Sequence, residues 1–153
     1  MTIGILLEPS PETRVSLIPE HISVLKKQNI NVLAESNCGS NAFAPDRLYS
    51  EQGAEISSRE NVLKNSDILL SIHPLTEDDL NKAKKSAVIL GVFNPLANFE
   101  LIKKWAEQGF TTFSMDMLPR TTRAQSMDVL SSQANIAGYK AVILGAMQLP
   151  KYF

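Results

Sequence analysis

The stretch that decides the fold is DILLSIHPLTEDDLNKAKKSAVILGV, residues 67–92. It begins and ends with short runs of Ile, Leu and Val that are apolar at successive positions, as in strands covered on both sides. Between these runs Thr76 precedes three acidic residues, which is typical of a helix N-terminus. The stretch therefore predicts a strand, a helix and a second strand, the pattern of a parallel sheet.

The same alternation continues in both directions along the chain. Predicted strands cover residues 2–7, 31–35, 67–72, 87–92 and 110–115, and predicted helices cover 19–29, 45–53, 58–65, 76–84, 98–108 and 131–149. We predict an α/β fold, a three-layer flavodoxin- or Rossmann-like domain with a parallel sheet, helices on both faces and a long last helix. The pattern leaves the strand order open.

Length and composition narrow the class of protein. The chain has 153 residues and 44% hydrophobic content, enough for one ordinary core, so we expect a single domain over residues 1–153. Its 15 basic and 16 acidic residues are scattered, which gives no basic face for nucleic acid. Cys38 is the only cysteine, so no internal disulfide can form, and a reducing compartment fits best. No apolar run approaches the ~20 residues of a membrane span.

The strongest candidate site is the polar loop at residues 116–131. It follows the last predicted strand, at the sheet edge where ligands of parallel α/β proteins sit. Arg120 offers a planar fork of donors, Gln125 both donor and acceptor, and Asp128 acceptors, with Ser131 just beyond. This set suits the amide and sugar hydroxyls of a nicotinamide riboside. From these residues alone, a simply solvated loop remains an open alternative.

Three further polar residues stand near predicted strand ends. Arg14 could face a ligand or form a surface ion pair. His73 could serve as acid or base, but no carboxylate is predicted beside it, which favours a structural role. Asn94, before Pro95, is typical of a turn. Glycine-rich dinucleotide, P-loop, HExxH and GxSxG motifs are all absent from the sequence, so the chain is predicted to be an accessory lobe of a two-domain enzyme.

Small residues recur at three- and four-residue steps along the predicted last helix. They are Ala134, Ala137, Gly138, Ala141 and Gly145. Such a seam lets another backbone approach closely. The pattern fits a helix packed on its own sheet as well as it fits a contact between subunits or domains.

Three segments resemble a known family. They are Ile3-Gly-Ile with Glu12-Thr-Arg-Val-Ser, the turn Glu35-Ser-Asn-Cys-Gly-Ser, and PRTTRAQSMDVLSSQANIAGYKAV at residues 119–142. Together they resemble the N-terminal domain shared by alanine dehydrogenases and NAD(P) transhydrogenase α subunits. Similar alanine dehydrogenases carry a catalytic lysine where His73 aligns and a catalytic histidine where Asn94 aligns. Both residues differ here, whereas Arg120, Gln125 and Asp128 match the transhydrogenase loop.

The resemblance implies hydride transfer from NADH to NADP⁺, coupled in the intact enzyme to proton translocation. Arg120 and Asp128 would fix the nicotinamide end of NAD(H), with Ser131 in the same cofactor set, while Gln125 would reach the nicotinamide riboside of NADP(H). The set Arg120, Gln125 and Asp128 would therefore catalyse by orientation. NAD(H) and NADP(H) are the implied cofactors, and no metal is expected.

The family also implies partners. Its members continue beyond residue 153 into a Rossmann domain with a glycine-rich loop, so we expect this chain to be a fragment without turnover alone. The implied partners are that Rossmann domain, NADP(H)-binding and membrane subunits, and a second copy in a homodimer. The implied location is cytoplasmic, peripheral to the inner membrane through the partner subunits. The alternatives are an alanine dehydrogenase lobe in which Arg14 grips the substrate carboxylate, and a non-catalytic assembly module.

Overall fold

A computed structural model describes residues 1–119 and 121–151. These residues fall into two compact units, divided between Ser114 and Met115, and each unit is described by itself below. The expected single domain over residues 1–153, with a Rossmann domain to follow, stays a prediction.

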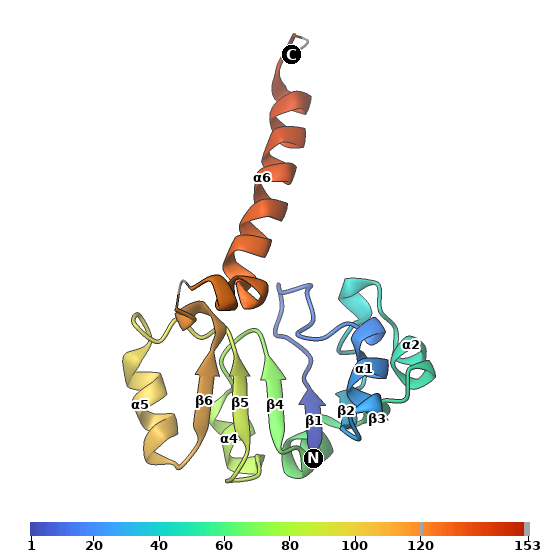
Figure 1. The fold of residues 1–153 in the computed structure, drawn as a ribbon, viewed down its shortest axis with the longest axis vertical. Helices are drawn as coiled ribbons and strands as arrows, with labels where there is room; N and C mark the ends of the chain where they lie inside the picture. The colour runs from blue at the N-terminus through green and yellow to red at the C-terminus, as the bar shows by residue number, and fades with distance from the viewer. Residues whose placement is uncertain (120, 152–153) are drawn as a thin grey trace. The chain divides into compact units, whose positions relative to one another are not determined.

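The first unit is built on a six-stranded parallel sheet, shown in Figure 1. The strands are β1 Thr2–Ile5, β2 Asn31–Glu35, β3 Glu55–Ser57, β4 Ile68–Ser71, β5 Val88–Gly91 and β6 Thr111–Ser114. Their order across the sheet is β3-β2-β1-β4-β5-β6. This is the order of doubly wound dinucleotide-binding sheets, whose direction of winding reverses between the first and fourth strands.

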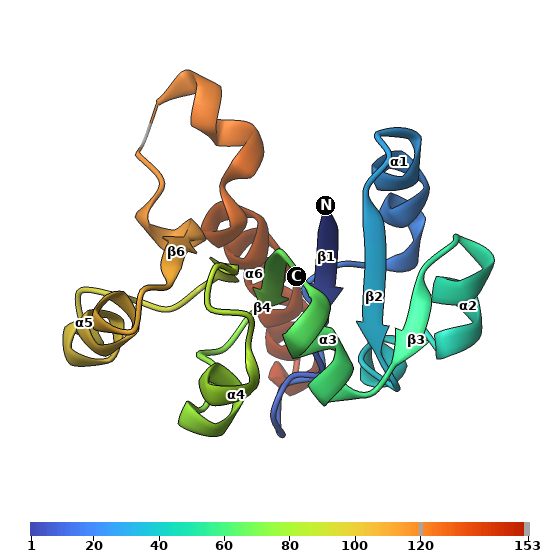
Figure 2. The same ribbon diagram turned by 90° about the horizontal axis from the view of Figure 1, so that it is seen from below.

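Helices cover both faces of this sheet (Figure 2). They are η1 Pro19–His21, α1 Ile22–Lys27, η2 Ser40–Ala42, α2 Asp46–Glu51, α3 Arg59–Asn65, α4 Glu77–Lys82 and α5 Phe99–Glu107. Thr76 caps α4 as predicted, and the structure adds that it forms a capping box with Asp79. The predicted fold class is confirmed, and the five predicted strands are found within two residues of their bounds.

Strand β3 was not among the predicted strands. It has only three residues and lies at the sheet edge, where Leu33 of β2 pairs with Glu55. An edge strand needs no continuous apolar run, because water covers part of its surface. The expectation of five strands was therefore one strand short.

Two hydrophobic clusters pack against the opposite faces of the sheet. One contains side chains of α3, α4 and α5, including Leu63, Leu80 and Trp105. The other contains Ile22 of α1 and Tyr49 of α2. Neighbouring strand residues enter different clusters because side chains alternate along a strand. Backbone packing is also close: a Cβ added to Gly91 would collide with the Ser71 carbonyl oxygen and the Phe93 ring.

The second unit consists of short turns followed by one long helix. Its elements are η3 Met115–Met117, η4 Thr122–Met127 and α6 Val129–Gln148. Helix α6 begins two residues before the predicted start because Asp128 caps it, accepting a hydrogen bond from the Ser131 N–H. No α6 residue is buried. Within residues 1–119 and 121–151, no helix combines the length and apolar character needed to span a membrane.

Candidate functional site

The second unit contains a hollow of about 450 Å³ around the predicted site. Gln125, Asp128 and Ser131 all line it. The rest of its lining comes from the preceding turns and the start of α6, namely Met115, Asp116, Leu118, Pro119, Thr121, Thr122, Ala124 and Leu130. Arg120 of the predicted set lies outside the described residues. The structure thus brings three of the four predicted site residues to one concave surface.

Asp128 is held in place by the start of its own helix. One carboxylate oxygen accepts from the Ser131 N–H at 3.0 Å, and the other accepts from the Ser131 hydroxyl at 2.6 Å. The Ser132 hydroxyl donates to the Asp128 backbone carbonyl at 3.1 Å. Asp128 and Ser131 therefore form a fixed pair at the positive end of the α6 dipole.

The Gln125 side chain, unlike those of Asp128 and Ser131, is not held by hydrogen bonds to other described residues. The Gln125 backbone carbonyl accepts from the Asp128 N–H at 3.3 Å, which fixes the backbone of the turn. Its side chain is exposed and makes no hydrogen bond to another described residue. An amide offers two donors and an acceptor, so this side chain can bond to either an amide or a hydroxyl of a ligand.

In the first unit, buried carboxylates fill the place where sheets of this strand order bind nucleotides. Glu8 follows β1, is 5% exposed, and accepts from the backbone N–H groups of Ile72 at 2.6 Å and His73 at 3.0 Å. It thereby ties the end of β1 to the end of β4, at the reversal point of the sheet. A nucleotide phosphate would meet a negative charge here and find these amides already engaged.

Glu35 completes this arrangement at the end of β2. In dinucleotide-binding sheets an acid at this place accepts from the ribose hydroxyls. Here Glu35 is 8% exposed and accepts from the Leu7 N–H and from Arg59, both at 2.8 Å. The expected acid is therefore present, but its carboxylate already accepts hydrogen bonds from within the chain.

Arg59 joins the loops at this edge of the sheet. Besides Glu35 it donates to both carboxylate oxygens of Asp79, at 2.7 and 2.9 Å, and to the Leu7 carbonyl at 3.1 Å. The hydrogen bonds to Asp79 raise the pKa of Arg59 further above its usual range. Burial of Asp79 opposes its ionisation, yet the bonds from Arg59 and Thr76 still hold its pKa below the ordinary value. Arg59 and Asp79 are therefore both charged at neutral pH.

His73 has a carboxylate beside it, contrary to the prediction. Its Nε2 lies 3.1 Å from a Glu12 oxygen. The same Glu12 forms a two-pronged ion pair with Arg14, at 2.8 and 2.6 Å. The pair with Arg14 holds the Glu12 pKa well below its usual range. Glu12 and His73 are 61 positions apart in the sequence, and they come into contact only because β1 and β4 are neighbours.

The structure also decides between the alternatives that the sequence left open for Arg14 and Asn94. Arg14 takes the surface ion-pair alternative, since Glu12 occupies its guanidinium. Asn94 has a positive φ of 46°, and its carbonyl accepts from the N–H groups of Ala97 and Asn98, so it forms the expected turn. Glu8, Glu35 and Arg59 were not singled out from the sequence. The one available signal was an acid just beyond one predicted strand, at residue 8, and an acid at the end of another, at residue 35.

Residues 4–137 match the family model of the alanine dehydrogenase/PNT N-terminal domain. The chain belongs to this family. Among its relatives is an NAD(P) transhydrogenase subunit alpha of Rickettsia prowazekii, 38% identical over 147 residues, covering 93% of this chain and 38% of the relative. The corresponding protein of Rhodospirillum rubrum is 34% identical, covering 100% of this chain and 42% of the relative.

Two solved structures are also similar to this chain. Transhydrogenase from Sinorhizobium meliloti superposes with a TM-score of 0.92 at 36% identity, covering 99% of this chain and 46% of that one. An L-alanine dehydrogenase superposes with a TM-score of 0.70 at 21% identity, covering 76% of this chain and 32% of that one, which shows a shared fold. The predicted family is confirmed. This alanine dehydrogenase/PNT N-terminal domain spans about two fifths of the curated transhydrogenase relatives named above.

Proposed function

We propose that this chain is the N-terminal part of the NAD(H)-binding component of a proton-translocating NAD(P) transhydrogenase, and that it positions nicotinamide for hydride transfer from NADH to NADP⁺. The observation that carries this proposal is the hollow in the second unit, where Gln125, Asp128 and Ser131 meet. Homology to transhydrogenase α subunits supports the reaction class.

The chemistry of the hollow suits one end of a nicotinamide nucleotide. The Asp128–Ser131 pair presents a fixed carboxylate and a hydroxyl, which match the carboxamide N–H₂ of nicotinamide. Gln125 supplies an adaptable amide for the second nicotinamide riboside, and Arg120 would add a cation. None of these groups needs to react, because holding two rings in contact converts a bimolecular transfer into an effectively unimolecular one.

The phosphates of NAD(H) require a different lobe. Glu8 and Glu35 occupy the phosphate and ribose positions of the first unit, and the sequence contains no glycine-rich dinucleotide loop. We therefore propose that a Rossmann domain outside residues 1–153 binds the phosphates, and that the chain alone gives no turnover. NADP(H)-binding and membrane subunits, a homodimeric state and attachment to the cytoplasmic side of the inner membrane belong to the same proposal.

The test is a titration of isotope-labelled chain with reduced nicotinamide mononucleotide, followed by NMR. We expect backbone amide shifts confined to residues 115–131, and no comparable shifts with AMP, which carries no nicotinamide. Gln125→Ala and Asp128→Asn should each weaken binding about tenfold, the loss of one good hydrogen bond. Gln148→Ala, at the far end of α6, is the matched control. Shifts that are the same for AMP, or unchanged in both site variants, would reject the proposal.

The alanine dehydrogenase alternative gains no support from the geometry. Glu12 engages Arg14 through two hydrogen bonds, so a substrate carboxylate would have to displace a carboxylate already in place. Titration with pyruvate separates the two functions. The transhydrogenase proposal expects no saturable change near Arg14, whereas the alternative requires one.

A further inference from the structure

A second hollow lies in the first unit, at the amino ends of the strands. It has a volume of about 600 Å³, within the range of small-molecule pockets. Thr2, Asn31 and Glu55, the first residues of β1, β2 and β3, all line it. Glu8 and Glu35, by contrast, follow β1 or end β2, at the carboxyl ends of the strands. This hollow is therefore separate from the filled nucleotide crevice.

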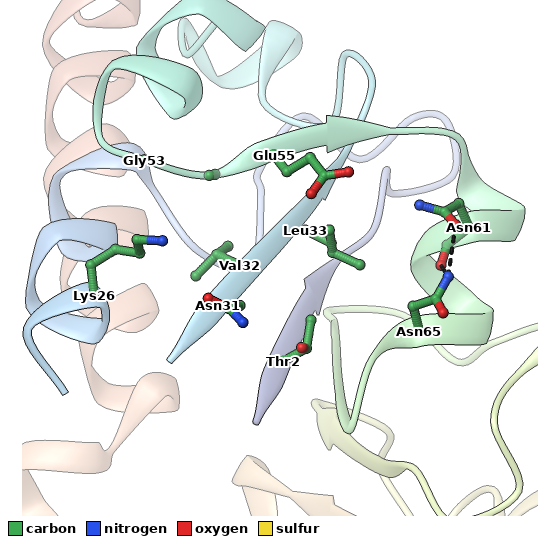
Figure 3. Close-up of a pocket in the computed structure, with 10 residues that line it drawn as sticks. Thr2, Lys26, Asn31, Val32, Leu33, Gly53, Glu55, Asn61 and Asn65 are labelled. Carbon is green, nitrogen blue, oxygen red and sulfur yellow. Dashed lines mark hydrogen bonds between the residues drawn. The ribbon is translucent and has the colours of Figure 1, made fainter. Parts of the chain in front are cut away.

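The walls of this hollow come from the two helical layers (Figure 3). Lys26 of α1 stands on one side, and Asn61 and Asn65 of α3 stand on the other, with Glu55 between them. Val32 and Leu33 of β2 also line the hollow, but they are only 2% and 8% exposed, so most of its surface is polar. In small-molecule sites, a few precisely placed polar groups fix the orientation of the ligand.

Two charged side chains in these walls have no partner among the residues that the structure describes. Lys26 and Glu55 form no ion pair or hydrogen bond through their side chains with any residue from 1–119 or 121–151. The aliphatic stem of Lys26 lies along Gly53, whose added Cβ would come within 3.3 Å of it. Gly53 has a φ of +92°, a conformation that favours glycine, so the turn keeps room for this stem.

The amides on the far wall are partly fixed and partly available. Asn61 donates to the Ser57 hydroxyl at 2.6 Å and accepts from Asn65 at 2.7 Å. The Asn65 amide nitrogen is thus engaged, while its oxygen has no donor among the described residues. The Asn31 side chain forms no hydrogen bond with any other residue that the structure describes. The hollow therefore offers a ligand the cation of Lys26, the carboxylate of Glu55 and the amide groups of asparagines.

We infer that this hollow binds a polar α-amino acid. The ligand carboxylate would pair with Lys26, its ammonium group with Glu55, and a polar side chain would bond to Asn31 and Asn65. A ligand that is only an anion or only a cation would pair with just one of Lys26 and Glu55. A zwitterion can pair with both, so it has the better electrostatic match. The inference does not depend on the proposed function, because every lining residue belongs to the first unit.

The experiment titrates isotope-labelled chain 1–153 with L-glutamine and follows the backbone amides of Val32, Gly53 and Asn65 by NMR. We expect saturable shifts with a Kd of about 1 mM or tighter. Acetate, which lacks the ammonium group, and propylamine, which lacks the carboxylate, should give no saturable shift over the same range. Lys26→Met and Glu55→Gln should each weaken binding at least about tenfold. Lys27→Met, one residue along the same helix and outside the hollow, is the matched control.

Each other outcome overturns the inference. Absence of saturable shifts with L-glutamine would mean that no amino-acid site exists here. Equal binding by Lys26→Met, Glu55→Gln and Lys27→Met would place the ligand elsewhere, and equal shifts with acetate would reduce the site to an anion contact at Lys26. The dispersion of each variant's spectrum shows whether it is folded. Failure here leaves the nicotinamide proposal untouched, because that test follows residues 115–131.

Discussion

The two units of this chain use their polar residues in opposite ways. In the first unit, Glu8, Glu35 and Arg59 bond to the protein's own backbone and to one another, so the crevice of a nucleotide-binding sheet is filled from within. In the second unit, Gln125 lies exposed in a hollow and Asp128 caps an exposed helix. The difference teaches that a sheet with the strand order of nucleotide-binding proteins can have its crevice filled by its own side chains; under the proposed function, ligand contact would lie in the loop of the second unit.

The packing of the first unit leads to the largest expected effect. Gly91→Ala should lower the free energy of unfolding by about 3 kcal/mol or more, because the new Cβ meets the Ser71 carbonyl and the Phe93 ring. Fluorescence of Trp105, the only tryptophan and fully buried, reports the unfolding of this unit in urea. The control is Gly138→Ala in α6, where an added Cβ meets nothing within 4 Å. It should stabilise the helix by up to about 1 kcal/mol. Similar effects of the two substitutions would contradict the contrast.

The charge network at the sheet edge gives the next effect. Arg59→Met should cost about 2 kcal/mol of unfolding free energy, because it leaves Glu35 and Asp79 buried without their cation. This is less than for a fully buried pair, since the Arg59 side chain is 35% exposed. Lys64→Met breaks the exposed pair with Glu60 and should cost far less, because water screens this pair. Equal costs in urea unfolding would show that the network contributes no more than a surface pair.

Glu12 makes a contribution to the free energy of unfolding that depends on pH. The pair with Arg14 lowers its pKa in the folded state below the ordinary 4.5, so its contribution is complete above about that pH and is lost as the pH falls further. Glu12→Gln should therefore cost about 1.5 kcal/mol at pH 7 and less at pH 3. Urea unfolding at the two pH values measures this. Glu20→Gln, at an exposed acid, should show a smaller difference; a pH-independent cost for Glu12→Gln would argue against the ion pair.

The cap of α6 gives the smallest effect. Asp128→Ala should cost about 1 kcal/mol locally, because the Ser131 N–H loses its acceptor. We expect faster hydrogen exchange at the first turn of α6 and little change in the unfolding of the first unit. Asp128→Ser, which restores a capping oxygen, should recover most of the protection. An equal loss in both variants would mean that the carboxylate charge, and not the cap, holds this end of the helix.

Local patterns in the sequence determined most of the fold. Apolar runs located five of the six strands, Thr76 with the acidic residues after it located the start of α4, and the segment at residues 119–142 identified the family and the candidate loop. These features depend on residues close together in the chain, where spacing and propensity dominate.

Only the tertiary structure decided the rest. The Glu12–His73 contact and the Glu35–Arg59 pair each join residues that are at least 24 positions apart. The strand order also depends on pairing between distant segments, and the edge strand β3 depends on its place at the solvent-covered edge of the sheet. The hollow at Lys26 and Glu55 likewise exists only where five elements meet. A sequence pattern records which side of an element is apolar, but not which element will lie against it, because that choice minimises the free energy of the whole core.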